Sequence, residues 1–450
     1  DCTNDWLNEI MKFTELEELT INYCMSLTDQ DLRRLVQTLP NLRKLTIKES
    51  LWLTDVSCLS HLSSVSIIGC RRVVDVQSLA NVDTLDLSYC SNIEDVRALG
   101  EGKVRVLTLT KCTKIRDIST LGNKHALDLS YCTQLTDSHI RVLGKIHTLD
   151  LSYCKQISDV SPLAHVHTLN LTSCTQVSNV RTLGRVHTLI LRDCPEIRDV
   201  EALGNVQNLD LSHCENLTNV DALGHVPVLN LNNCTALQNV EQLTAVTDLN
   251  LSNCPEIQNV DALGNTRVLN LSCCTGVQNV NNLTGVTTLD LSYCCEIVDV
   301  RGLANTHTLD LSGCDRLEDV TPLARVHTLS LSNCAALRDV TALAEVHTLD
   351  LSYCPRISDV SALRKVRTLN LSGCKNVRDV SALGEVYRLN ISSCRNITDV
   401  SALGQVYSLD ISFCTGIRDG SALRSVPYLT ITGCDPILYN TIFIDRSTLI

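Results

Sequence analysis

Apolar and polar positions in this chain follow one pattern of twenty residues that is repeated many times. The copy over residues 346–363 reads VHTLDLSYCPRISDVSAL, and its cysteine recurs every 20 residues from Cys154 to Cys434, in 15 copies without a slip. A fixed period of this length is typical of a solenoid, in which each copy forms one coil stacked on the next.

Within one copy, the spacing of the apolar residues predicts the local structure. Leu169 and Leu171 alternate with polar residues, which predicts a short strand with the leucines facing inward. Cys174 then marks a turn. Asn179, which is Asp in most copies, precedes the inward Val180 and is expected to cap a tight 3-10 turn.

A single coil of this kind cannot fold alone. Burying about six aliphatic side chains contributes ~1.5–3 kcal/mol each, whereas ordering twenty residues costs ~1–2 kcal/mol each in backbone entropy. Stacking must supply the difference. We therefore expect a right-handed coil with one long parallel β-sheet on its concave face and short turns or 3-10 segments outside.

The regularity of the copies predicts the organisation of the chain. Residues 1–15 are expected to form a helix or cap, 16–60 longer first copies, 61–144 less regular copies and 145–434 regular copies, about 21 coils in all. Residues 435–450 are expected to be a cap or the start of a further repeat, because Leu449 lies in phase with Leu429. Since the chain begins with Asp rather than Met, we expect it to be a segment of a longer one.

Three copies depart from the period of twenty. The copy from Cys24 to Ser50 spans 26 residues, which leaves room for a helix over residues 30–39 with Asp29 as its expected N-cap. Two later copies span 22 residues, and their extra residues, around 101–103 and 138–145, are expected to form bulges.

Twenty of the 24 cysteines occupy the same position of the repeat. Disulfide frameworks use irregular spacings in short chains, so this row predicts buried, reduced thiols that act as small apolar residues with weak S–H donors. A reducing, intracellular and cytoplasmic location follows from that interpretation. No pair of cysteines has the spacing of a metal site, and we expect neither a metal nor a cofactor.

The negative charge is concentrated in the middle of the chain. Residues 201–300 contain 11 acidic residues and one base, Arg267, so they account for −10 of the formal charge of −12. Nucleic acid is therefore not expected to bind this segment, and a basic protein surface is the favoured partner. No run of 18 apolar residues is present, so no membrane span is expected.

The outward positions of the strands form polar rows, the first mostly Thr, the second Asp or Asn and the third mostly Ser. A polar and adaptable binding surface is one interpretation, and soluble side chains that form hydroxyl and amide ladders are the other. The candidate binding residues on the concave face, where the acidic segment carries these rows, are Asp210, Asn230, Asp248, Asn250, Asn270, Asp290 and Asp310.

Histidines recur at the position just before the Thr row, in two groups of three: His147, His167 and His187, then His307, His327 and His347. Stacked imidazoles could bind a transition metal, but no carboxylate or thiol shares their position, and a solvated stripe that titrates near pH 6 is favoured. The Asp and Asn residues before the 3-10 turns could bind calcium, yet capping uses their oxygens.

The spacing of Leu349, Leu351 and Cys354 matches the leucine-rich repeat pattern LxxLxLxx(N/C). The continuation to Ile357 and Asp359 resembles the cysteine-containing subclass found in F-box-type substrate-recognition subunits, and the Asp-Val-Ser-Ala-Leu tail is similar to repeats of trypanosomatid leucine-rich repeat proteins. The resemblance covers nearly the whole chain and implies the fold. No F-box precedes the repeats, and 20 residues are fewer than the 26 of that subclass.

These observations favour a protein–protein interaction scaffold that binds a basic partner through its concave face, and such a scaffold could be part of a larger assembly. A secreted or surface recognition protein and a substrate-recognition subunit of a ubiquitin ligase are the alternatives. No nucleophile–base pair, phosphate loop or metal motif stands apart from the repeat, so we do not expect an enzyme.

Overall fold

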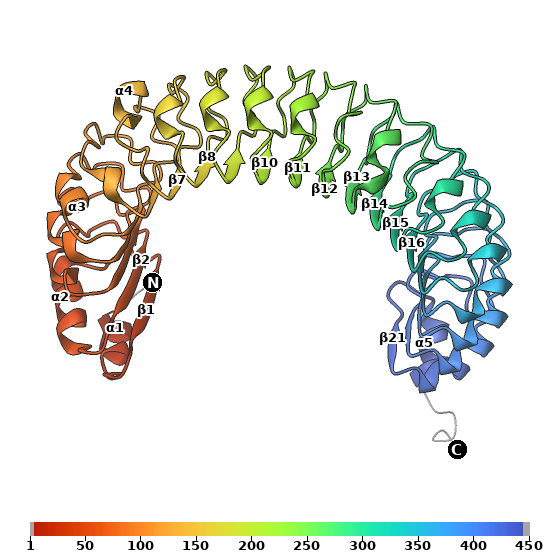
Figure 1. The fold of residues 1–450 in the computed structure, drawn as a ribbon. Helices are drawn as coiled ribbons and strands as arrows, with labels where there is room; N and C mark the ends of the chain where they lie inside the picture. The colour runs from red at the N-terminus through yellow and green to blue at the C-terminus, as the bar shows by residue number, and fades with distance from the viewer. Residues whose placement is uncertain (1–3, 444–450) are drawn as a thin grey trace. The chain divides into compact units, whose positions relative to one another are not determined.

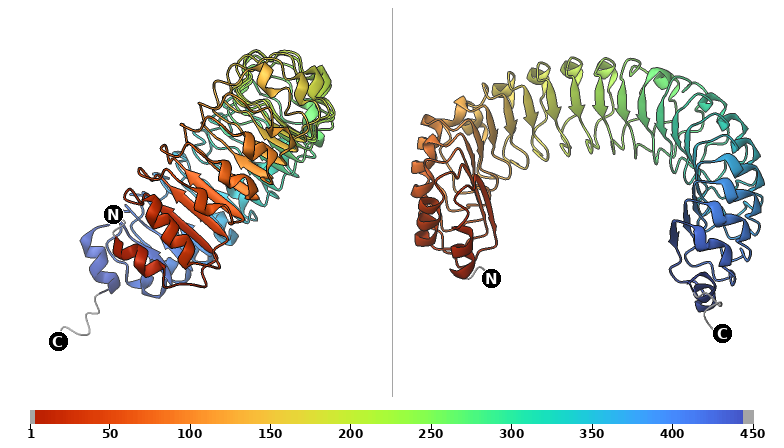
Figure 2. Two further views of the ribbon diagram at one scale, coloured as in Figure 1. Left: turned by 90° about the vertical axis from the view of Figure 1, so that its left-hand side faces the viewer. Right: turned by 90° about the horizontal axis from the view of Figure 1, so that it is seen from below.

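The computed structural model describes residues 4–443, so the expected repeat around Leu449 lies outside the described residues. The chain divides into two compact units, Asp1–Val226 and Pro227–Ile450. In each unit the strands line the inner side of the coils and the helical segments lie on the outer side (Figure 1). The two further views in Figure 2 show the same layering.

The first unit contains ten of the strands, each paired in parallel with its neighbours in the chain. These strands are β1 (Glu18–Asn22), β2 (Lys44–Lys48), β3 (Ser64–Ile68), β4 (Thr84–Asp86), β5 (Val106–Thr108), β6 (Ala126–Asp128), β7 (Thr148–Asp150), β8 (Thr168–Asn170), β9 (Thr188–Ile190) and β10 (Asn208–Asp210).

The described part of the second unit, up to residue 443, contains eleven strands with the same parallel pairing. They are β11 (Val228–Asn230), β12 (Asp248–Asn250), β13 (Val268–Asn270), β14 (Thr288–Asp290), β15 (Thr308–Asp310), β16 (Thr328–Ser330), β17 (Thr348–Asp350), β18 (Thr368–Asn370), β19 (Arg388–Asn390), β20 (Ser408–Asp410) and β21 (Tyr428–Thr430). Each leucine pairs with the leucine of the next coil, as Leu289 does with Leu309.

The outer side of the coils is formed mainly by 3-10 helices, from η1 (Ser57–Leu59) to η15 (Ser421–Ser425). As expected, an Asp or Asn side chain caps their start: the Arg181 N–H donates to Asn179 Oδ1 over 3.2 Å and the Ser361 N–H to Asp359 Oδ1 over 2.9 Å. The leucine-rich repeat solenoid with its parallel sheet and outer 3-10 turns is thereby confirmed.

Within residues 4–443, five α-helices interrupt the regular pattern: α1 (Asn4–Ile10), α2 (Asp29–Thr38), α3 (Arg97–Glu101), α4 (Asp137–Ile140) and α5 (Pro436–Phe443). The two 22-residue copies, where we expected bulges, carry the short helices α3 and α4; a bend at 102–103 follows α3, and turns over 141–145 follow α4. The expected N-cap of α2 was wrong. Thr28 is the cap, in a reciprocal capping box with Asp31, whereas Asp29 accepts from the Thr54 N–H of the next coil over 2.8 Å.

The cysteine row lies in the core, and its buried thiols are free, as predicted. In the regular copies these thiols donate to the carbonyl of the leucine or isoleucine that directly follows the strand of the preceding coil. Cys174 Sγ donates to Leu151 O over 3.2 Å, and Cys354 Sγ to Leu331 O over 3.0 Å. The thiols therefore serve as small core residues that also satisfy a buried acceptor.

The residue before each of these cysteines adopts a left-handed backbone, which the sequence pattern did not reveal. Tyr353 has a φ of 57° and Gly373 a φ of 72°. The Tyr353 ring lies over Gly373, where a Cβ would come within 2.6 Å of Tyr353 Cδ1. The non-glycine residues directly before these cysteines therefore adopt left-handed backbone angles, which such residues rarely do.

Candidate functional site

All the Asp and Asn candidates except Asp248 lie at the end of a strand, where they cap the turn that follows; Asp248 is the first residue of β12. The Ser292 N–H donates to Asp290 Oδ1 over 2.9 Å, and the Ser272 N–H donates to Asn270 Oδ1 over 2.8 Å. Asp310 accepts from Ser312 in the same way. One side-chain oxygen of each of these residues thus accepts from the backbone, which leaves the second carboxylate oxygen of an Asp, or the amide NH2 of an Asn, to face a partner.

A groove of about 480 Å³ follows the strand face of the second unit from β13 to β18. Three of the predicted residues, Asn270, Asp290 and Asp310, line it together with the threonines Thr308 and Thr328. Their side chains are half-buried. The Oδ2 atoms of Asp290 and Asp310 have no hydrogen-bond or ion-pair partner within residues 4–443, so two carboxylate oxygens remain available at the edge of an otherwise largely apolar floor.

The other candidates lie elsewhere. Asn230 and Asn250 cap their own turns on β11 and β12 and do not line this groove. Asp248 forms an ion pair with Arg267, with Asp248 Oδ1 and Arg267 Nη2 2.7 Å apart. The single base of the acidic segment therefore neutralises one of the predicted binding residues.

Asp210 belongs to the first unit and lines a separate depression of about 580 Å³ beside Tyr153, Arg192 and Asp193. The repeat departs from its pattern here, because Ile190 replaces the usual Asp or Asn and Arg192 the usual Ser. Asp210 Oδ1 caps its turn by accepting from the Ser212 N–H over 2.8 Å. Only the repeat departure marks this depression in the sequence.

The Ser row, which we expected on the strand face, lies in the turn after each strand and is buried or half-buried: Ser152, Ser212, Ser252, Ser312 and Ser352 are buried, and Ser272, Ser292 and Ser332 are half-buried. Ser152 is 6% exposed and Ser212 is 3% exposed. The strands end at the Asp or Asn residue, and the cap formed by Asp150 with the Ser152 N–H turns the chain toward the next coil. Because the alternation of a strand stops at this point, the third polar row belongs to the turn.

The histidines stack as their spacing predicts. The ring centroids of His147 and His167 are 4.5 Å apart, and those of His167 and His187 are 4.6 Å apart. His125 extends this row by one ring at 4.9 Å; its spacing of 22 residues, rather than 20, hid it in the sequence. The second row behaves alike, with 4.8 Å between His307 and His327 and 4.5 Å between His327 and His347.

Stacking makes acid destabilise the first unit. Partial desolvation, and then the neighbouring imidazoles His147 and His187, hold the pKa of His167 below its usual value. The unfolded chain therefore binds the proton more readily than the folded one. The contribution of His167 to stability is complete above pH 6.5 and is lost as the pH drops below that value. We expect His167→Gln to lessen the loss of thermal stability between pH 7.5 and pH 5.5.

The matched control for this measurement is His165→Gln, because His165 is an exposed histidine two residues away that takes no part in the stacked row. Thermal unfolding followed by circular dichroism at both pH values compares the variants. Equal acid sensitivity of His167→Gln and His165→Gln would contradict the role of stacking.

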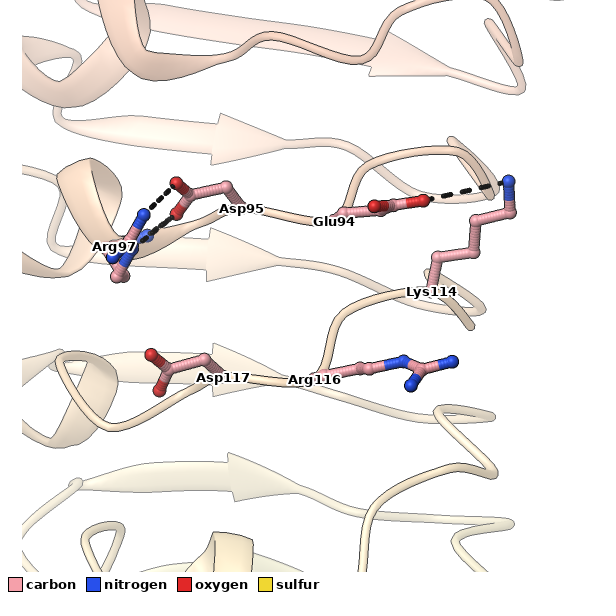
Figure 3. Close-up of a pocket in the computed structure, with 6 residues that line it drawn as sticks. All are labelled: Glu94, Asp95, Arg97, Lys114, Arg116 and Asp117. Atoms are coloured by element: carbon pink, nitrogen blue, oxygen red, sulfur yellow. Dashed lines mark hydrogen bonds and ion pairs between the residues drawn. The ribbon is translucent and has the colours of Figure 1, made fainter.

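A charged cluster on the outer turns of the first unit is a weaker candidate. Glu94, Asp95, Arg97 and Lys114 surround a shallow space of about 430 Å³ with Arg116 and Asp117 (Figure 3). Arg97 Nη2 lies 2.7 Å from Asp95 Oδ2 and, with its backbone N–H, lowers the pKa of Asp95 to about 2. The acids and bases thus largely satisfy one another, and exposed pairs of this kind contribute little.

Across residues 4–443, no group of three or more His, Cys, Asp or Glu residues could hold a metal ion. The parallel rings of the histidine rows direct their nitrogen lone pairs side by side, which does not converge on one ion. In the same range, no helix is both long and apolar enough to cross a membrane.

Part of the groove lies outside the residues predicted from the sequence. Asp350 and Asn370 line it as well, and they continue the Asp/Asn row, but the candidate set stopped at Asp310 because it followed the charge density. The row itself was the better signal, since the groove follows the strands and not the net charge.

No protein-family model matches this sequence, and no curated protein matches it. Solved structures resemble it. An internalin from Listeria monocytogenes is 17% identical over 91% of this chain and 86% of that chain, with a TM-score of 0.31. The functional domain of InlJ from Listeria monocytogenes, described as including a cysteine ladder, is 18% identical over 89% and 74%, with a TM-score of 0.30. A leucine-rich repeat protein of Leptospira interrogans is 16% identical over 97% and 95%, with a TM-score of 0.42. These likenesses carry no argument about function.

Proposed function

We propose that this protein is an interaction scaffold that binds a basic protein partner on its strand face, and that it acts by binding rather than by catalysis. The groove from β13 to β18 carries the proposal, because Asp290 and Asp310 each present a carboxylate oxygen without a partner among the described residues. Lysine or arginine side chains of a partner would supply the missing cations.

The charge around this end of the second unit supports a basic partner. Residues 227–300 contain seven acidic residues and one base, Arg267, which is already paired with Asp248. A surface with this excess attracts basic proteins and repels nucleic acid. The free buried thiols also support a reducing, intracellular location as part of the proposal.

The test compares the wild type with an Asp290→Asn, Asp310→Asn variant. Asn serves in the same row at Asn270, where its Oδ1 caps the turn as Asp290 does, so the variant loses charge and keeps the cap. In cross-linking mass spectrometry on material from the natural source, we expect a basic protein cross-linked to coils 270–310, with at least about a fivefold loss of yield in the variant.

The control is Asp359→Asn, Asp399→Asn, which removes two charges from capping residues of the outer turns in the same unit. It should leave the cross-links unchanged. The proposal would be contradicted if the cross-links persisted in the Asp290→Asn, Asp310→Asn variant, or if their yield fell equally in the control.

A further inference from the structure

A second feature of this unit is a row of side chains just before the strands, in which three histidine rings stack on one another and Arg367 stacks with two tyrosine rings. We call it the stacked row: His307, His327, His347, Arg367, Tyr387 and Tyr407. The histidine rings stack at 4.8 and 4.5 Å, Arg367 Cζ lies 4.9 Å from the centre of the Tyr387 ring, and the Tyr387 and Tyr407 rings stack at 4.5 Å. Most of these side chains are exposed.

The stacked row presents hydrogen-bond donors. His307 Nδ1 lies 3.3 Å from Thr308 Oγ1, and His347 Nδ1 lies 3.1 Å from Thr348 Oγ1. In the tautomer in which the threonine hydroxyl donates to Nδ1, the proton lies on Nε2, and a protonated imidazole carries a proton on Nε2 in any case; Nε2 has no partner within residues 4–443. Arg367 has no ion pair there either, so its guanidinium adds donors and a positive charge.

The charged groups beside the stacked row carry a small positive excess, three bases against two acids. Arg325 and Arg388 flank it, and Lys365 is paired with Glu345 at 2.8 Å, which leaves Glu385 as the acidic neighbour. The carboxylates Asp310 and Asp350 lie at the opposite end of the strands. Tyrosine and arginine are also the residues that most often dominate binding energy at interfaces.

We propose that the stacked row docks an acidic α-helical segment of a partner protein, independently of the basic partner proposed for the groove. The spacing of the row, 4.5–4.9 Å, approaches the ~5.4 Å pitch of a helix that carries a glutamate on every turn. Same-side residues of an extended strand are ~6.6 Å apart and match it less well. Because the rings cover one another's faces, the row offers no surface on which nucleic-acid bases could stack.

Protonation of the histidines adds positive charge to the row, so docking should strengthen as the pH falls. Burial and the neighbouring imidazoles hold the pKa of His327 below its usual value, which places most of this gain below pH 6.5. Glutamate stays ionised at pH 5.5, since its usual pKa is about 4.3.

The probe is a fluorescent helical peptide of roughly twenty residues with glutamate on one face, and a second peptide has the same composition with its glutamates scattered around the helix. Fluorescence anisotropy with the full chain, at low salt, gives the Kd at pH 7.5 and pH 5.5. We expect tighter binding of the one-faced peptide, by about tenfold at pH 5.5 relative to pH 7.5.

Two variants locate the site. Arg367→Ala, Tyr387→Ala should weaken binding by at least about fivefold. Its matched control, Arg356→Ala, Tyr353→Ala, removes the same residue types from exposed turn positions of the same unit and should leave the Kd unchanged. His307→Gln, His327→Gln, His347→Gln should abolish the gain at pH 5.5, with thermal unfolding confirming that each variant is folded.

The proposal is overturned if neither peptide binds, if the scattered peptide binds equally well, or if the control variant weakens binding as much as Arg367→Ala, Tyr387→Ala. A pH gain that persists without the three histidines overturns their role. None of these results depends on whether a basic protein binds the groove.

Discussion

Raising the pH from 8 to 10 is expected to unfold this protein, because its core is built around buried thiols. Burial raises the pKa of eight cysteines of the cysteine row to about 12: Cys90, Cys132, Cys174, Cys214, Cys294, Cys334, Cys394 and Cys414. In the unfolded chain the same thiols ionise near pH 9.0. Their contribution to stability is therefore complete below pH 9 and is lost as the pH rises toward 12.

The expected effect is large because the thiols act together. Above pH 9, the ionisation of each thiol in the unfolded chain lowers the free energy of unfolding by about 1.4 kcal/mol per pH unit. Eight thiols together lower it by on the order of 10 kcal/mol at pH 10. That is comparable with the whole free energy of unfolding of a typical domain. Ionisation would also remove a hydrogen bond. Cys354 Sγ donates to Leu331 O over 3.0 Å, and as a thiolate it could no longer donate.

Urea unfolding followed by circular dichroism between pH 8 and pH 10.5 measures this loss. The control replaces Cys174 and Cys214 by serine, the residue that already occupies this row at Ser50, where its Oγ lies 3.4 Å from Leu27 O. These replacements should make the alkaline loss shallower, since two titrating groups are gone. A free energy of unfolding that stays constant to pH 10 would refute the explanation.

Restoring the repeat's own valine at position 420 is expected to destabilise the C-terminal end of the second unit. Regular copies carry valine here, from Val160 to Val400, yet this coil has Gly420. Helix α5 packs over the glycine: a Cβ there would lie 2.5 Å from Ile442 Cγ1 and 2.7 Å from Leu438 Cδ1. The Gly420 N–H also donates to Thr441 Oγ1 over 2.8 Å.

Gly420→Val should therefore displace α5 and cost about 1–3 kcal/mol, as overpacking of a filled site does. Limited proteolysis should cut the variant near residue 435 faster than the wild type, and its thermal unfolding should begin earlier. The control makes the same substitution in a chain that ends at Asp435, where α5 is absent and valine should be neutral or stabilising. A stabilising Gly420→Val in the full chain would contradict the packing of α5.

The last coil departs from the valine of the regular copies for a physical reason. In a stack, each valine of this row is covered by the valine of the next coil, and Gly420 is instead covered by a helix that needs the space of the missing side chain. The sequence analysis noted the irregular end over residues 435–450 and expected a cap or a further repeat there. It did not connect Gly420 with the two apolar side chains of α5, because that contact bridges residues about twenty apart.

Much of the architecture was predictable from the sequence alone. The alternation of Leu169 and Leu171, the spacing of the cysteines and the Asn179 position predicted strands, buried reduced thiols and capped 3-10 turns, and the structure confirms each of them. They were predictable because every coil has the same inward-facing and outward-facing positions, so that the pattern of one copy can be checked against many others along the chain.

Other features were decided only by the stacked coils. The sequence determined which residues face inward and how the histidines align, since a fixed period places equivalent residues side by side. The tertiary structure decided that Ser152 is buried, that Asp248 is neutralised by Arg267, and that the groove extends to Asp350. These outcomes depend on where a three-residue strand stops and on which side chain of the next coil covers it, and a period of twenty contains no information about either.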